Sequence, residues 1–161
     1  MAAPLTPPQL DALRLALPRL FGNLDEATFL SIHSRLPWEW VERAAGEVLF
    51  VEGDPSDALF LLLSGRLQAT VSASGGVPQI VGEIGRGESV GEMGVLTNKP
   101  RRATVMALRD SILARVELSA FNEMLQSFPS LALNFTRVII ERLERRNASQ
   151  KPTHNVTNLA V

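Results

Sequence analysis

The sequence contains no cysteine and only two histidines, His33 and His154, among its 161 residues. A chain without cysteine forms no disulfide framework and no thiolate metal site. Two separated histidines are also too few for the usual zinc or copper site, and we read both as structural or solvent-exposed. The sequence therefore predicts no metal site.

Charge and hydrophobicity exclude further classes of protein. Charged residues make up 20% of the chain and the formal net charge is −1, so no global field favours nucleic acid or an anionic membrane. No run of about 18 apolar residues is present, and the first residues lack a basic start. We therefore expect a cytoplasmic protein. A length of 161 residues with 45% apolar content predicts about one domain with a buried core.

The sequence also lacks the groups that enzymes use for covalent or metal-assisted attack. There is no serine nucleophile elbow, no catalytic dyad and no cluster of metal ligands. We expect no catalytic residues, and the chain alone is not predicted to be an enzyme.

Residues 1–36 have helical patterns. Thr6 and Gln9 form a capping box around the first turn of a helix, and apolar residues follow at a spacing near 3.6. A second helix is expected from about residues 23–25 to Arg35, because Pro37 follows.

Residues 37–118 have the pattern of short strands. Apolar runs alternate with polar residues, and glycines at 53, 65, 75 and 76 lie where hairpin turns need a positive φ. Arg109–Asp110 is interpreted as one more turn. About eight short strands are expected, which is typical of a β-roll or jelly roll.

Residues 119–146 are again helical, and residues 147–161 are interpreted as a linker. Ser119 is expected to cap the first of two helices. The second helix carries an apolar stripe of Leu131, Phe135, Val138, Ile139 and Leu143. Its arginines, Arg142, Arg145 and Arg146, are interpreted as a solvated face that also compensates the helix dipole. The predicted fold class is α+β, mainly β: an eight-stranded β-roll flanked by N-terminal helices and C-terminal hinge or lid helices.

One segment, SVGEMGVLTNKPRRATV at residues 89–105, has residue choices that packing does not explain. A glycine turn followed by a short helix from Glu92 would expose backbone N–H groups to an anion. Arg101 could add a bidentate clamp on the same phosphate, and the Glu92 carboxylate could accept a hydrogen bond from a ribose hydroxyl. These residues predict a nucleotide site. Without a P-loop lysine or an acidic pair for magnesium, triphosphate chemistry is not expected.

The same segment resembles the phosphate-binding cassette of cyclic nucleotide-binding domains. Gly91-Glu92 match the start of that pattern, and Pro100-Arg101 followed by residues 103–105 match its end. The resemblance covers roughly residues 20–146. It implies that Glu92 binds the ribose 2′-hydroxyl, that Arg101 binds the cyclic phosphate, and that the last helix acts as a lid. The implied ligand-binding residues are Gly91, Glu92, Met93, Gly94, Arg101, Arg102 and Ala103.

The family usually has a small residue where this chain has Arg102. In some members a hydroxyl at that position selects guanine, so the resemblance implies cAMP as the ligand rather than cGMP. One alternative stays open: a degenerate domain whose Arg102 fills the phosphate pocket and which mediates contacts only.

Two further alternatives concern the host protein. Sensory domains of catabolite-activator-type transcription regulators share the fold, but the fifteen residues after Arg146 are too few for a helix-turn-helix, and nucleic acid is not an expected partner. The tail HNVTNLAV resembles the linker after cyclic nucleotide-binding domains in bacterial relatives of patatin-like phospholipases, the neuropathy-target-esterase group. We therefore expect a regulatory module that signals to a downstream effector domain, with an esterase as candidate effector and a homodimer left open.

Overall fold

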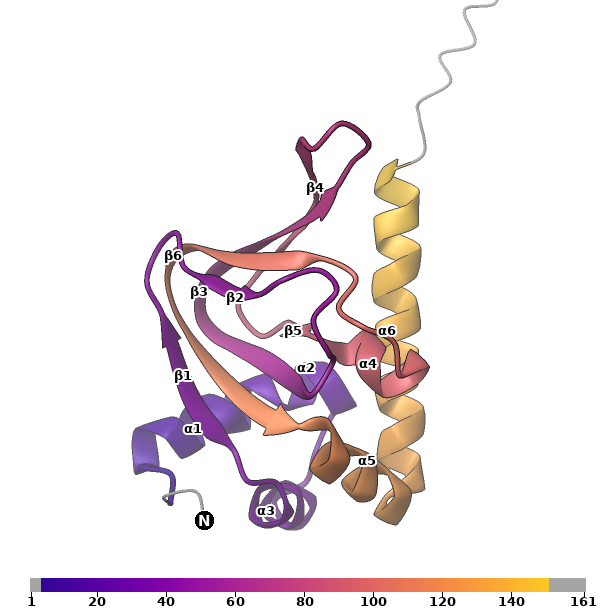
Figure 1. The fold of residues 1–161 in the computed structure, drawn as a ribbon. Helices are drawn as coiled ribbons and strands as arrows, with labels where there is room; N and C mark the ends of the chain where they lie inside the picture. The colour runs from indigo at the N-terminus through magenta and orange to yellow at the C-terminus, as the bar shows by residue number, and fades with distance from the viewer. Residues whose placement is uncertain (1–3, 151–161) are drawn as a thin grey trace, which may run out of the picture.

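Helices lie at both ends of the described chain and strands lie between them (Figure 1). The computed structural model describes residues 4–150. The elements are α1 (Pro7–Ala16), α2 (Pro18–Phe21), α3 (Glu26–Arg35), β1 (Glu39–Arg43), β2 (Val48–Phe50), β3 (Ala58–Ser72), β4 (Pro78–Ile84), β5 (Ser89–Val90), α4 (Glu92–Thr97), β6 (Thr104–Glu117), α5 (Leu118–Ser127) and α6 (Pro129–Gln150).

The N-terminal helices begin where their caps predict. The Thr6 backbone N–H donates to Gln9 Oε1 at 2.9 Å, directly before α1. Asp25 Oδ1 accepts from the Thr28 backbone N–H at 2.7 Å and starts α3, which ends at Arg35 as predicted. Each cap satisfies a backbone N–H that has no partner within its own helix.

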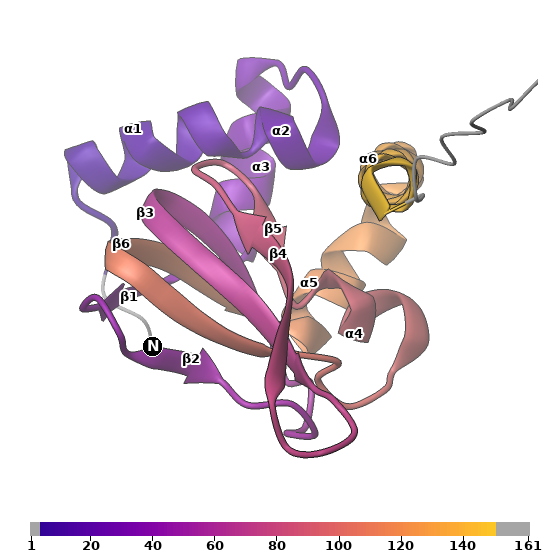
Figure 2. The ribbon, with the colours of Figure 1, turned by 90° about the horizontal axis from the view of Figure 1, so that it is seen from above.

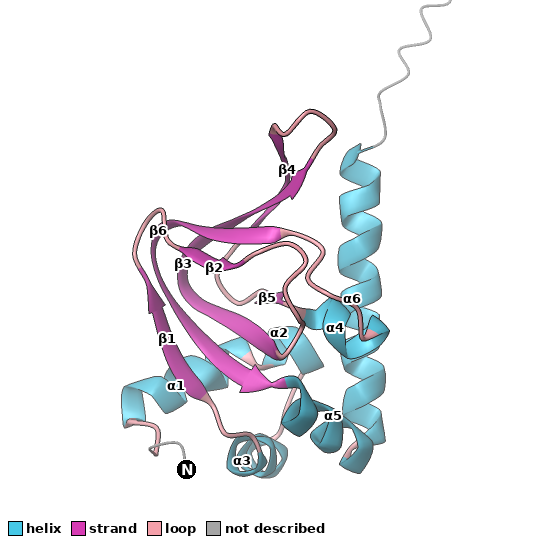
Figure 3. Cartoon of the chain, in the orientation of Figure 1, coloured by secondary structure: helices cyan, strands magenta, loops and turns pink. Residues whose placement is uncertain are grey.

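The strands form one antiparallel sheet with the order β1-β6-β3-β4, in which β2 also pairs with β6 and β5 also pairs with β3. Six strands are present in the described residues, whereas eight were expected. The difference comes from β3 and β6, which are 15 and 14 residues long and each take the place of two short strands. Figure 3 shows these strands curving into a roll, with helices below and beside it.

Two predicted turns are bends within those long strands. Gly65 lies inside β3 and Arg109–Asp110 lies inside β6, at positions where the pairing register shifts. Gly65 has φ +100°, and a Cβ at this position would collide with Ser111 Oγ and lie 2.7 Å from the Asp110 carbonyl oxygen. The glycine therefore permits a sharp bend of the strand, and no hairpin forms there.

Both faces of β3 are buried over its first six residues, 58–63, which explains the continuous apolar run there. Leu59, Leu61 and Leu63 belong to a cluster shared with the helices. Phe60 and Leu62 belong to a second cluster inside the roll. Figure 2 shows α1, α2 and α3 together on one side of the strands, with β2 on the other side.

The last helix, α6, stands along the side of the roll next to α4 and α5 (Figure 1). Leu131, Phe135 and Ile139 are buried, and the Phe135 ring meets the Phe121 ring edge-on at 5.2 Å. Leu143 is exposed, so the predicted apolar stripe was wrong at this position. The predicted Ser119 cap was also wrong, because α5 already begins at Leu118.

The fold class is α+β and mainly β, as predicted: a curved antiparallel sheet with helices before and after it. None of the helices within residues 4–150 is both long enough and apolar enough to span a membrane.

Candidate functional site

The segment that the sequence singled out forms a turn, a short helix and a loop between β5 and β6. Gly91 has φ +88° and precedes α4, which begins at Glu92 as predicted. A Cβ at Gly91 would collide with Arg101 Nη1 and lie 2.8 Å from the Ala58 carbonyl oxygen. Glycine is needed here for two reasons: the left-handed backbone, and the close approach of the arginine.

Arg101 is buried although it carries a charge. It is 6% exposed, and its Nη2 donates to the Ala58 carbonyl oxygen at 2.9 Å and to Asp57 Oδ1 at 3.3 Å. Its guanidinium lies over the Phe50 ring, 4.1 Å from the centroid. Burial lowers the pKa of the Arg101 guanidinium, and the Asp57 carboxylate opposes that shift. Arginine nevertheless stays protonated, so a permanent cation sits in the interior.

Two donors of this buried cation are unused. Arg101 Nε and Nη1 have no hydrogen-bond partner among the described residues. A buried polar atom without a partner destabilises a fold by about 1–3 kcal/mol, and by more when it is charged. The arrangement therefore leaves Arg101 able to bind an anion.

Glu92 presents the opposite case, a buried carboxylate with one free oxygen. It is 6% exposed, and its Oε1 accepts from Arg142 Nη1 at 3.2 Å. Its Oε2 has no partner within the described part of the chain. Since a carboxylate oxygen accepts hydrogen bonds, Oε2 is a ready acceptor for a hydroxyl donor.

The partner of Glu92 is a residue that the sequence reading misjudged. Arg142 is 8% exposed and is not part of a solvated face. Its Nη1 donates to the Ser89 carbonyl oxygen at 2.8 Å and to Ser89 Oγ at 3.2 Å, as well as to Glu92. Glu88 Oε2 lies 3.9 Å from its Nε. Arg142 therefore holds α6 against β5 and the start of α4.

The helical pattern contained a signal for this role. Leu131, Phe135 and Ile139 recur at a spacing of four residues, and Arg142 comes three residues later on the same face. A charged residue on a buried face must find a partner there. Sequence reasoning placed Leu143 on this stripe, and the structure places Arg142 there.

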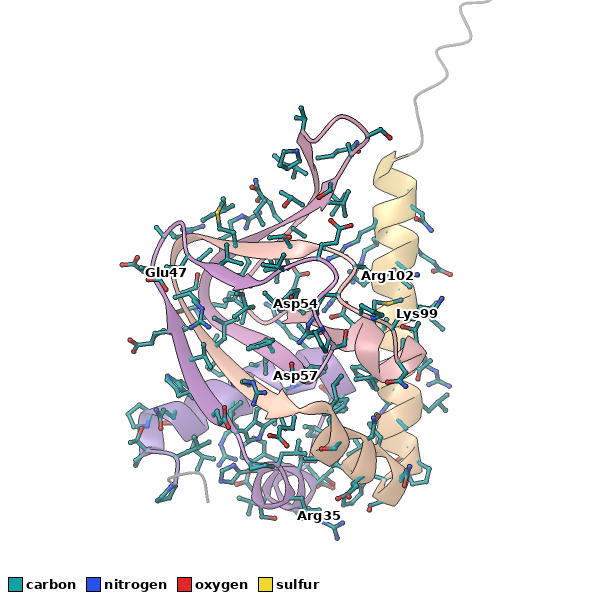
Figure 4. The ribbon with its side chains drawn as sticks, in the orientation of Figure 1. Arg35, Glu47, Asp54, Asp57, Lys99 and Arg102 are labelled. Atoms are coloured by element: carbon teal, nitrogen blue, oxygen red, sulfur yellow. The ribbon has the colours of Figure 1, made fainter. Side chains whose placement is uncertain are left out.

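All seven predicted ligand-binding residues line one cavity of about 390 Å³. Figure 4 shows that Arg102 lies on the side of the roll that faces α6. Apolar residues of the strands and of α6 form the rest of the wall, among them Val71, Val81 and Leu143. The cavity thus combines a polar inner end with an apolar wall, which is typical of sites for small organic ligands.

Arg102 does not take the place of a ligand beside Arg101. Arg102 is exposed, so its guanidinium is not buried at the inner end of the cavity. The sequence left open a degenerate domain in which the Arg102 side chain fills the phosphate pocket. This arrangement is not seen in residues 4–150.

The described residues also contain no group of three His, Asp or Glu side chains that could hold a metal ion. A guanidinium with two unpartnered nitrogens and a carboxylate with one unpartnered oxygen in one cavity suit an organic ligand. Such a ligand would carry both an anionic group and a hydroxyl.

Comparison with known proteins agrees with this geometry. The family model described as "Cyclic nucleotide-binding domain" matches residues 40–128. The chain is 39% identical over 136 residues to a protein named Lysophospholipase nte1 from Aspergillus terreus, covering 84% of this chain and 8% of that protein. It is 40% identical over 127 residues to the protein of the same name from Aspergillus oryzae, covering 79% of this chain and again 8% of the relative. The chain thus spans less than a tenth of the length of these relatives.

Solved structures share the fold. The regulatory domain of Toxoplasma gondii PKA, crystallised with cAMP, is 27% identical with a TM-score of 0.67, over 74% of this chain and 46% of that chain. A cyclic nucleotide-binding domain from Methylobacillus flagellatus is 20% identical with a TM-score of 0.77, over 89% of this chain and 83% of that chain. The second likeness is evidence for the fold alone.

Proposed function

The chain belongs to the cyclic nucleotide-binding domain family, and on this premise we propose that it binds cAMP, in preference to cGMP, as the regulatory module of a larger protein. One observation carries the proposal. The unpartnered Nε and Nη1 of Arg101 and the unpartnered Oε2 of Glu92 are atoms of residues that line the same cavity. A cyclic nucleotide carries the two matching groups, a singly charged phosphate and a ribose hydroxyl.

Each matching group has a proposed partner. Arg101 binds the cyclic phosphate, with the backbone around Gly91, Met93, Gly94 and Arg102 completing the cradle and Ala103 lining it. Glu92 Oε2 accepts a hydrogen bond from the ribose 2′-hydroxyl while Oε1 stays with Arg142. The apolar wall that includes Val71 and Leu143 then receives the base. Arg102 offers no hydroxyl to a guanine, which favours cAMP.

The proposed output runs through α6. Arg142 joins this helix to Glu92, so a ligand that contacts Glu92 also acts on the hydrogen bonds that hold the helix. A shift of α6 on binding would report occupancy to the proposed effector domain. We propose residues 37–118 as the sensing unit, residues 119–146 as the lid and residues 147–161 as the connection.

The relatives suggest what the module regulates. They are named lysophospholipases, and this chain corresponds to 8% of their length. We propose an esterase or phospholipase as the downstream effector, with the module itself performing no catalysis. Since its proposed ligand is an intracellular messenger, we expect it in the cytoplasm.

Calorimetric titration tests the proposal directly. We expect the purified chain to bind cAMP with one site per chain, cGMP more weakly, and 5′-AMP, which lacks the cyclic phosphate, more weakly still. A chain that is folded by circular dichroism but binds none of the three would overturn the proposal. That result would leave the contact-mediating alternative.

A further inference from the structure

The side chains of two arginines at the nucleotide cavity have no proposed role in the binding of a cyclic mononucleotide. Arg102, from the loop before β6, and Arg146, from α6, both line the cavity. Arg102 is exposed and Arg146 is half-buried. Neither forms an ion pair within residues 4–148, where side chains are described.

The charges around the cavity are unbalanced as a result. Its charged lining residues are Glu92, Arg101, Arg102 and Arg146. Glu92 is already paired with Arg142, and Arg101 is paired with Asp57 and is the proposed partner of the cyclic phosphate. Two guanidinium groups therefore remain at the cavity without an anion.

A second groove adjoins the nucleotide cavity at Val81 and Arg146. Val81 and Arg146 line both the nucleotide cavity and this groove of about 700 Å³ between β4, the turn at Gly87 and α6. The charged residues of this groove are Arg19, Glu83, Glu88, Arg142, Arg145 and Arg146. A ligand longer than one nucleotide could extend past Arg146 without leaving a basic surface.

We propose that Arg102 and Arg146 form a second anion subsite, so that the cavity prefers a nucleotide with two phosphates, such as a cyclic dinucleotide, to a cyclic mononucleotide. The inference rests on the proposed function and deepens it. The first phosphate occupies the inner end at Arg101, and the second lies between Arg102 and Arg146. Guanidinium groups suit this role because they donate two parallel hydrogen bonds to a phosphate.

Two simpler roles of these arginines make different predictions. If the arginines only steer anions toward the cavity, they raise the association rate of every anionic ligand, and salt screens the effect. If Arg146 only compensates the dipole at the end of α6, its removal affects the helix and no ligand in particular. Of the three roles, only an anion subsite changes the selectivity between ligands with one phosphate and ligands with two.

The experiment compares two adenine ligands, cAMP and cyclic di-AMP, by calorimetry on the whole 161-residue chain. The variants are Arg102→Gln, Arg146→Gln and the double variant. Arg109→Gln is the matched control, since Arg109 is an exposed arginine of β6 that does not line the cavity. Circular dichroism checks that each variant is folded.

We expect wild type to bind cyclic di-AMP at least about 10-fold more tightly than cAMP, a difference typical of an added charged hydrogen bond. The double variant keeps the backbone N–H of residue 102 in the cradle. It should lose about 10- to 100-fold for cyclic di-AMP and less than about 3-fold for cAMP. Arg109→Gln should change neither affinity.

The failures are distinguishable. If wild type binds cAMP but binds cyclic di-AMP no better, or if the double variant weakens both ligands equally, the subsite is wrong and the proposed function stands. If folded wild type binds neither ligand, the proposed function fails and the subsite fails with it.

Discussion

The two faces of β3 are both buried over residues 58–63, but the regions that they adjoin differ in the polar atoms that they leave without a partner. The face toward the helices is filled by apolar side chains, with the aromatic rings of Phe21, Phe121 and Phe135 in mutual contact. The face toward the inside of the roll adjoins a cavity that contains a guanidinium and a carboxylate with free hydrogen-bonding atoms.

Buried side-chain atoms without a hydrogen-bond partner also occur elsewhere in the described residues, but those atoms do not belong to charged groups that line one cavity. The others are His33 Nδ1 and Trp38 Nε1, ring nitrogens of aromatic side chains. An unpartnered atom of a buried charged group costs more than an unpartnered ring nitrogen, and a ligand can supply the missing partner. We therefore expect the helix-covered face to serve stability, and we propose that the face inside the roll serves binding.

The largest effect should follow from damage to the helix-covered face. Phe135→Ala removes a fully buried ring, and we expect the free energy of unfolding to fall by about 3–5 kcal/mol. Urea denaturation measures it. The matched control is Leu133→Ala on the same helix, where the side chain is 53% exposed and the loss should stay below about 1 kcal/mol. Equal losses would show that α6 does not seal the core through Phe135.

Damage inside the roll should instead act on affinity. Arg101→Ala leaves a bound phosphate to backbone N–H groups alone, and we expect cAMP affinity to fall by about 10- to 100-fold. Arg101→Lys should weaken binding too, because an ammonium cannot reproduce the planar fork. Calorimetry reports both. Unchanged cAMP affinity in Arg101→Ala would show that Arg101 does not bind the cyclic phosphate.

The sequence predicted the inner end of the site better than its connection to α6. Gly91, Glu92 and Arg101 were found because their spacing follows a local pattern, and the structure places all three at one cavity. Arg142 was missed because its partners, Ser89 and Glu92, lie about fifty residues away in the chain. The roles of all these residues in binding stay predictions.

The fold shows the same contrast. Features that depend on neighbouring residues were predicted correctly, and a feature that depends on residues far apart in the sequence was not. The capping box at Thr6 and Gln9 gave the correct start of α1, and the start of α3 was expected to within about two residues, because such signals depend only on neighbours. Gly65 was misjudged because a positive φ looks the same in a hairpin turn and in a bent strand. Only the pairing of β3 with β6 decides between them, and that pairing joins residues far apart in sequence.

Arg142 belongs to both regions, and its removal should affect both. Arg142→Ala leaves the Glu92 carboxylate buried without its cation, and we expect the free energy of unfolding to fall by about 1–3 kcal/mol. Arg137→Ala, an exposed arginine of the same helix, is the control and should have little effect. If both variants unfold at the same denaturant concentration, the hydrogen bonds of Arg142 contribute nothing to holding α6.

A smaller effect concerns how ligand occupancy reaches α6. Saturating cAMP should slow amide hydrogen exchange across residues 130–146 by about 5-fold or more, because a ligand at Glu92 also stabilises its contact with Arg142. The exposed hairpin around Gly75 and Gly76 serves as an internal reference, since it does not line the cavity. Unchanged exchange in residues 130–146 would exclude α6 as the output.

Glu92 Oε2 and Arg101 are proposed to bind two different groups of one ligand. The direct test is the affinity of wild type and of Glu92→Gln for cAMP and for 2′-deoxy-cAMP, which keeps the phosphate and lacks the hydroxyl. We predict that wild type prefers cAMP by about 10-fold or more, the worth of one charged hydrogen bond, and that Glu92→Gln binds the two ligands nearly equally. Wild type that binds both ligands equally, or a Glu92→Gln variant that keeps the full preference, would contradict the account.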